Sequence, residues 1–106
     1  MPYLKITSRF PSDTGPAAAE KHLEVLSKFP HDESISIETV PAAVRMTHKG
    51  VKSFSISEVK DGKLDAAYSR AVKMMAMFIG IKGFEYTIEI YSKIDEAMAT
   101  MGMEMP

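Results

Sequence analysis

The sequence predicts a single α+β domain in which two β–α units of similar size are each followed by a further strand. Two observations carry this prediction: apolar residues alternate with polar ones along each expected strand, and apolar residues recur on one stripe of each expected helix. The first unit joins the strand Tyr3–Phe10 to the helix Ala17–Phe29, and the second joins the strand Val51–Val59 to the helix Lys63–Ile79. The predicted order is therefore β-α-β-β-α-β over residues 1–106.

The first unit has clear start and stop signals. Tyr3–Phe10 has an apolar residue at nearly every second position, which is typical of a half-buried strand. Pro16 stands where a proline begins a helix, and Pro30 follows the helix end. The residues expected on the apolar stripe of this helix are Ala18, Ala19, His22, Leu23, Leu26 and Phe29.

The strand after the first helix is irregular. Residues 35–40 alternate, Pro41 interrupts the run, and the pattern resumes near Val44 before a turn at Lys49-Gly50. A proline at this place predicts an edge strand or a bulge, because proline cannot donate a hydrogen bond to a neighbouring strand.

The second helix and the last strand are bounded by glycine. Lys82-Gly83 resembles a helix C-cap, and the strand Phe84–Tyr91 has the clearest alternation in the chain. A capping box that begins at Ser92 predicts a short final helix reaching Met101. The inward positions expected for the second helix are Leu64, Ala67, Tyr68, Ala71, Val72, Met75, Phe78 and Ile79.

Right-handed crossover connections place both helices on one face of the sheet, which gives a ferredoxin-like sandwich of four antiparallel strands. We expect the apolar side of every strand to face the helices: Leu4, Ile6, Phe10, Phe54, Ile56, Phe84, Tyr86, Ile88 and Ile90. The opposite face should then carry Lys5, Thr7, Arg9, Ser53, Ser55, Glu85, Thr87 and Glu89.

The first and last strands are neighbours in this fold, so Lys5 and Arg9 can lie across from Glu85 and Glu89. These four charges could line a site for a small polar or anionic ligand, in which Arg9 would bind a carboxylate with its two-pronged guanidinium group. They could also be a network that holds two subunits together, or a partly solvated face, and ion-pair networks are more often structural than catalytic. Both interpretations stay open.

Composition excludes several classes of function. The net charge is −1 with 13 basic and 14 acidic residues well mixed, so no basic stripe for nucleic acid is visible. No apolar run reaches the length of a membrane span. The absence of cysteine excludes disulfides, thiol nucleophiles and iron–sulfur clusters, and the first residues do not resemble a signal peptide. We therefore expect a cytoplasmic protein.

The later turns of the second helix are apolar almost all round, since Lys73 and Lys82 are the only charges between Ala71 and Phe84. A helix of this kind is covered on more than one side, and a second subunit is the simplest cover. The sequence thus predicts a homodimer.

The chain resembles the dimeric α/β-barrel superfamily, and most closely its small proteins of unknown function. The resemblance rests on the segment 53–59 followed by the second helix, on Gly83-Phe84-Glu85-Tyr86 and on Phe10-Pro11. It implies a homodimer whose sheets pack face to face, with ligand sites between sheet and helices or inside the shared barrel. Enzymes of that superfamily, among them cofactor-independent monooxygenases and haem-degrading oxygenases, commonly use Asn, Trp or His. This chain has no Asn and no Trp, so their chemistry cannot be transferred residue by residue.

Three polar side chains on the expected inward faces, His22, Tyr68 and Tyr86, could converge on one cavity as a general base and two hydroxyl donors. Each could also be a core residue with a satisfied polar tip. The histidines show no metal-ligand spacing, so we expect no metal and no cofactor. The sequence identifies no catalytic residue. It favours a small-molecule binding or structural module, with a cofactor-independent oxygenase- or isomerase-like enzyme as the alternative.

Overall fold

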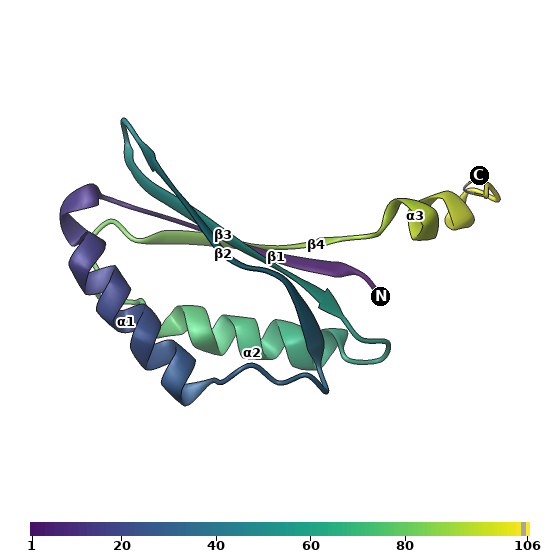
Figure 1. The fold of residues 1–106 in the computed structure, drawn as a ribbon, viewed down its shortest axis with the longest axis horizontal. Coiled ribbons are helices and arrows are strands. Elements are labelled where there is room, and N and C mark those ends of the chain that lie inside the picture. The colour runs from purple at the N-terminus through teal and green to yellow at the C-terminus, as the bar shows by residue number, and fades with distance from the viewer. Residues whose placement is uncertain (105) are drawn as a thin grey trace.

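A computed structural model gives the structure of the chain and describes residues 1–104 and 106. Figure 1 shows an open sheet with two long helices on one side and a short helix beyond its end. The elements are β1 (Tyr3–Phe10), a 3₁₀ turn (Ser12–Thr14), α1 (Gly15–Lys28), β2 (Ser36–Thr47), β3 (Gly50–Val59), α2 (Leu64–Ala76), β4 (Glu85–Tyr91) and α3 (Ile94–Thr100).

The four strands form one antiparallel sheet in the order β2-β3-β1-β4. The α+β class, the order of the elements and the pairing of the first strand with the last are confirmed, and the topology is compatible with a ferredoxin-like fold. Both α1 and α2 lie on the same face of the sheet (Figure 1). The opposite face is bare, so the described chain has only two layers.

β2 is an edge strand and is irregular around Pro41, as the sequence predicts. Its register against β3 shifts between Glu38 and Val40 and again between Val40 and Ala43. The missing N–H of proline at this point explains why regular pairing stops and resumes.

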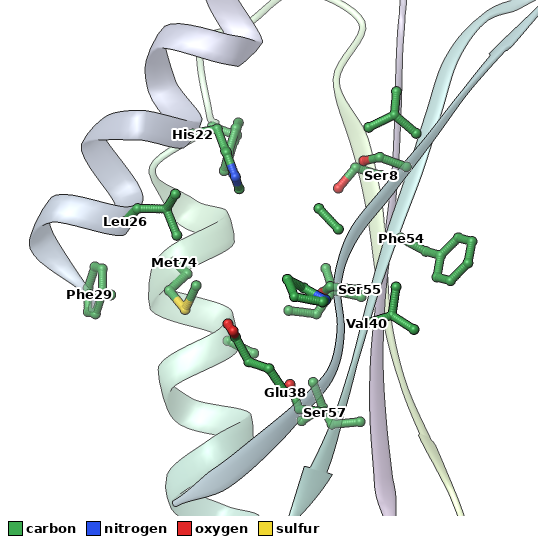
Figure 2. Close-up of a pocket in the computed structure, with 18 of the residues that line it drawn as sticks. Ser8, His22, Leu26, Phe29, Glu38, Val40, Phe54, Ser55, Ser57 and Met74 are labelled. Carbon is green, nitrogen blue, oxygen red and sulfur yellow. The ribbon is translucent and has the colours of Figure 1, made fainter. Parts of the chain in front are cut away.

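The faces of β3 are the reverse of those predicted. Ile6 pairs with Ser55 and Leu4 with Ser57, so the serines of β3 share the helix side with the apolar residues of β1. Phe54 and Ile56 point to the bare face, and Figure 2 shows Ser55 and Phe54 on opposite sides of the sheet.

Two valines at the ends of β3 explain this orientation. Val51 and Val59 are 7% and 0% exposed, and both have the same parity as the serines. Val59 packs with Leu4, Ala67 and Ala71 in the core, so its burial fixes which side of the strand meets the helices. Because side chains alternate strictly, the three positions between the valines must follow.

A second core cluster joins the two helices: Val25 of α1 packs with Met75 and Phe78 of the α2 region. Val25 is 2% exposed, whereas Leu23 and Leu26 are 67% and 46% exposed. The predicted stripe of α1 is therefore wrong at its centre. The buried side of the helix, which contacts Met75 and Phe78, lies about one position, or 100°, away from the predicted one.

The apolar end of α2 is largely covered by its own chain. The helix ends at Ala76, three residues earlier than predicted, and the chain turns so that Phe78 stacks on Phe84 with ring centroids 4.6 Å apart. Phe84 in turn stacks on Phe10 at 5.6 Å. Tyr68, Val72 and Ile79 remain exposed on the outer side. Less of this helix is therefore left for a partner to cover than the sequence predicts.

The capping box of the final helix begins at Lys93, one residue later than the predicted Ser92. Lys93 is the N-cap residue, and its backbone N–H donates to Glu96 Oε1 at 3.0 Å. The ammonium group of Met1 donates to the same carboxylate, and Lys93 forms an ion pair with Glu58 of β3. These contacts fasten α3 to the end of the sheet. Among the described residues, no helix combines the length and apolar character that crossing a membrane requires.

Candidate functional site

A cavity of about 490 Å³ lies between α1, α2 and the helix side of the sheet. Figure 2 shows it between the two helices and strands β2 and β3. The cavity exists because small side chains line both sides: Ala18 and Ala19 on α1 face serines on the sheet, and neither fills the space. The reversed orientation of β3 is thus the direct cause of the cavity.

The helix wall of the cavity is apolar. Leu26 and Phe29 extend from α1 and its end, and Met74 extends from α2 (Figure 2). Leu26 is 46% exposed although it is a large apolar residue, which leaves part of its surface free to contact a bound molecule.

The sheet floor of the cavity carries a row of hydroxyl groups. Ser8 of β1 lies opposite Ser53 of β3, and Ser55 and Ser57 continue the row along β3. Residues two apart on a strand are separated by about 6.8 Å. Ser8 is buried at 8% exposure, and the three serines of β3 are half-buried. Each hydroxyl can both donate and accept a hydrogen bond.

A carboxylate completes the polar side. Glu38 extends from β2 into the cavity (Figure 2), and its Oε1 lies 3.6 Å from Nδ1 of His31. The loop that carries His31 is held by Asp32, whose Oδ1 accepts from the hydroxyl of Ser34 at 2.5 Å and from its backbone N–H at 2.9 Å. These two hydrogen bonds lower the pKa of Asp32 below its ordinary value.

Arg70 of α2 lines the cavity near Pro30, the residue that follows the end of α1. Its guanidinium group donates to the carbonyl oxygen of Pro30, and it lies 5.6 Å from the ring centroid of Phe29. This arginine therefore ties the end of α1 to α2 and holds one wall of the cavity in place.

Of the three residues predicted to converge, only His22 lines this cavity, and Figure 2 shows its ring directed into it. Tyr68 is 45% exposed and is not part of the lining. Tyr86 is 40% exposed and lines a separate hollow of about 150 Å³ with Arg9 and Glu85. The structure does not bring the three side chains together.

The four predicted charges lie on the bare face of the sheet, away from the cavity. Lys5 pairs in register with Glu89, and Arg9 with Glu85, as the sequence predicts. No ion pair within 4.0 Å joins them in the described part of the chain. Lys5 Nζ instead lies 5.2 Å from the ring centroid of Phe54.

Glu89 has a different partner, Tyr91. The hydroxyl of Tyr91 donates to Glu89 Oε2 at 2.8 Å. This hydrogen bond raises the pKa of the Tyr91 hydroxyl above its ordinary value.

Several residues of the cavity were not predicted from the sequence. Glu38, His31 and Arg70 come from an irregular strand, a loop and an outward helix position, where no periodic signal marks them. The alternating serines of β3 were visible as a pattern but were expected on the wrong face. Within residues 1–104 and 106, no three His, Asp or Glu side chains come together as a metal ion would require.

No protein-family model, curated protein or solved structure matches this chain.

Proposed function

We propose that the protein binds a small amphipathic molecule in the cavity between α1, α2 and the sheet. The observation that carries this proposal is an apolar helix wall facing a row of four serine hydroxyls across a space of about 490 Å³. Binding pockets for small molecules typically measure about 300–1,000 Å³ and combine apolar walls with a few placed polar groups.

The chemistry of the two walls defines the ligand class. The apolar part of the molecule would cover Leu26, Phe29 and Met74, and its hydroxyl, amide or amine groups would meet the serines and the carboxylate of Glu38. A ligand whose polar groups form hydrogen bonds with the serines and Glu38 can take the place of water there without loss.

We also propose that two copies form a homodimer of ferredoxin-like subunits, as the resemblance to dimeric α/β barrels implies. Support comes from the bare sheet face, where Phe54 and Ile56 point away from the helices. Apolar side chains in the middle of a sheet face favour a covering partner. The cavity lies on the other side, so ligand binding and dimer formation can be tested separately.

Cofactor-independent proton transfer is a second candidate function. One observation favours it: His22 points into the cavity, and His31 stands 3.6 Å from Glu38 at its rim. A histidine beside a carboxylate can act as a general base. A turnover that H31Q or H22Q abolishes while ligand affinity stays unchanged would support catalysis over simple binding, and a turnover that both variants retain would exclude these histidines as the base.

Blocking the cavity tests the binding proposal. We expect the wild-type protein to bind the amphipathic dye 1-anilinonaphthalene-8-sulfonate, and A19W to weaken its affinity at least about tenfold by filling the space. A17W is the matched control, because Ala17 is an exposed residue of the same helix that does not line the cavity. Equal dye affinity in A19W and A17W, with both proteins folded by thermal melting, would exclude the cavity as the binding site.

A further inference from the structure

The cavity between the helices and the sheet is elongated, and its two ends differ in chemistry. Figure 2 shows Glu38 and Ser57 together at one end, whereas His22 and Ser8 lie toward the other. The cavity also reaches Phe10, which lies about 20 Å from Ser57 along the sheet. A long ligand would therefore meet different groups with its head and with its tail.

Three phenylalanines form one end, called here the aromatic end. The ring of Phe84 stacks on Phe10 at 5.6 Å and on Phe78 at 4.6 Å, and all three residues line the cavity. In the described part of the chain, the only acidic or strongly basic side chains of the lining are Glu38 and Arg70. Both lie at the opposite end, called here the polar end. The aromatic end therefore suits an uncharged apolar group.

The carboxylate of Glu38 has no strong counter-charge within the chain. Within the part of the chain that the structure describes, no lysine or arginine nitrogen lies within 4.0 Å of it. Nδ1 of His31 lies 3.6 Å away, and this side chain is charged only when it is protonated. A carboxylate in this position favours a cation supplied by the ligand.

Two hydroxyl groups flank this carboxylate. Ser57 is the direct cross-strand partner of Glu38, and Ser36 precedes Glu38 by two residues on β2. Both serines line the cavity, at Cα distances from Glu38 of about 5 Å and about 7 Å. The polar end thus offers one carboxylate and two hydroxyl oxygens as acceptors. A primary ammonium group has three N–H donors, one for each of them.

The end of α1 adds to this preference for a cation. Phe29, the C-cap of α1, lines the cavity at the polar end, and the carbonyl groups that end a helix carry a partial negative charge. Arg70 already uses one nearby carbonyl group, since its guanidinium donates to the oxygen of Pro30 and lies 5.6 Å from the ring centroid of Phe29. It is not within 4.0 Å of Glu38, so that carboxylate stays available.

We infer that the ligand of this cavity is a primary amine with a single apolar chain. Glu38, Ser36 and Ser57 bind the ammonium group, and the chain runs along α1 toward the aromatic end. This inference rests on the binding function proposed above and narrows its ligand class. At about 30 Å³ for each water-sized group, 490 Å³ holds on the order of 15 non-hydrogen atoms. Decylamine fits within this limit and leaves space for water on the remaining serines.

Three ligands with the same alkyl chain test the head group: decylamine, decan-1-ol and decanoate. Each competes with the uncharged dye Nile red at about pH 8, where histidine is neutral. We expect decylamine to bind about fivefold more tightly than decan-1-ol and at least about tenfold more tightly than decanoate, which Glu38 repels.

A substitution pair tests the role of the carboxylate. E38Q should remove the advantage of decylamine over decan-1-ol, because the neutral amide keeps the shape of the side chain and loses its charge. E20Q is the matched control with the same change in net charge, since Glu20 is an exposed residue of α1 that does not line the cavity. Thermal melting confirms that both variants are folded.

A diamine tests the direction of the chain. In 1,10-diaminodecane a second ammonium group replaces the end of the tail and would lie among Phe10, Phe78 and Phe84 without an acidic partner. Desolvating that charge should make the diamine bind at least about tenfold more weakly than decylamine. Equal affinity of the two amines would overturn the placement of the tail.

The remaining outcomes separate this inference from the binding proposal. Decanoate that binds more tightly than decylamine would overturn the inference in favour of an anionic head group at Arg70. Equal affinities of the three ligands, an amine preference that E38Q retains, or a dye that decylamine does not displace would overturn it and leave the cavity as the binding site. Equal affinity of Nile red for A19W and A17W would instead overturn the binding proposal itself.

Discussion

The contrast between Val25 and Leu26 gives the sharpest test of the core. The sequence pattern places Leu26 inside, whereas the structure buries Val25 at 2% exposure against Met75 and Phe78 and leaves Leu26 46% exposed. Truncating Val25 to alanine removes two methyl groups from the core, worth about 1.6 kcal/mol at about 0.8 kcal/mol each. A small additional cost for the unfilled space brings the expected loss to about 2 kcal/mol. L26A removes a larger part of a side chain than V25A does, but Leu26 is half exposed on the cavity wall. We therefore expect L26A to lower the free energy of unfolding by less than about 1 kcal/mol.

Urea unfolding of the two variants and the wild type at one protein concentration measures both losses. In a domain of this size V25A should lower the melting temperature by about 10 °C and L26A by less than half as much. An L26A loss equal to or larger than that of V25A would refute the placement of α1, and with it the wall of the cavity.

Two further predictions concern the backbone and pH. Gly83 and Gly62 have φ of +77° and +76°, but an added Cβ at Gly83 would lie 2.7 Å from Cγ of Pro11, whereas nothing lies within 4 Å at Gly62. G62A should therefore lower the free energy of unfolding by about 1 kcal/mol, and G83A should lower it by more. Urea unfolding measures both losses, and equal losses would contradict the close approach of Gly83 to Pro11. The hydrogen bond between Met1 and Glu96 lowers the pKa of Glu96 below 4.5 and raises that of the N-terminus above 8.0. The stabilisation that this ion pair contributes is therefore fully present between pH 4.5 and pH 8.0. It is lost as the pH falls through the lowered pKa of Glu96 or rises through the raised pKa of the N-terminus. E96Q should accelerate amide exchange in α3 most near neutral pH, and an acceleration of the same size at all pH values would contradict the ion pair.

Much of the architecture could be predicted because local signals agree with it. The alternation in Tyr3–Phe10 and in the last strand gave both strands their correct faces, and the order of the elements alone predicts that these two strands are neighbours, with Lys5 and Arg9 across from Glu85 and Glu89. Pro41 marked the irregular edge strand for a reason that is independent of tertiary structure, since it has no N–H to donate.

The orientation of β3 could not be predicted because alternation does not say which side is buried. The rule that apolar side chains face the helices favours Phe54 and Ile56, and it fails here because Val51 and Val59 at the strand ends take the buried positions. Two short apolar anchors therefore prevail over two larger apolar side chains in the middle of the strand.

The cavity was only partly predictable for a related reason. His22 was found because it interrupts an apolar stripe, but Glu38 and Arg70 reach the cavity through the bulge in β2 and the packing of α2 near Pro30. Such positions depend on how elements are placed relative to each other. No periodicity in the sequence reports that placement.

The cavity floor and the bare sheet face both depend on the orientation of β3, which turns its serines to the helices and Phe54 and Ile56 to the bare face. Cross-strand backbone NOEs between β1 and β3 test it most directly, because a shift of one residue in register exchanges the two faces. The account predicts that Ile6 lies opposite Ser55 and Ser8 opposite Ser53. NOEs that place Ile6 opposite Phe54 or Ile56 would contradict it, and both the hydroxyl floor of the cavity and the apolar centre of the bare face would be lost.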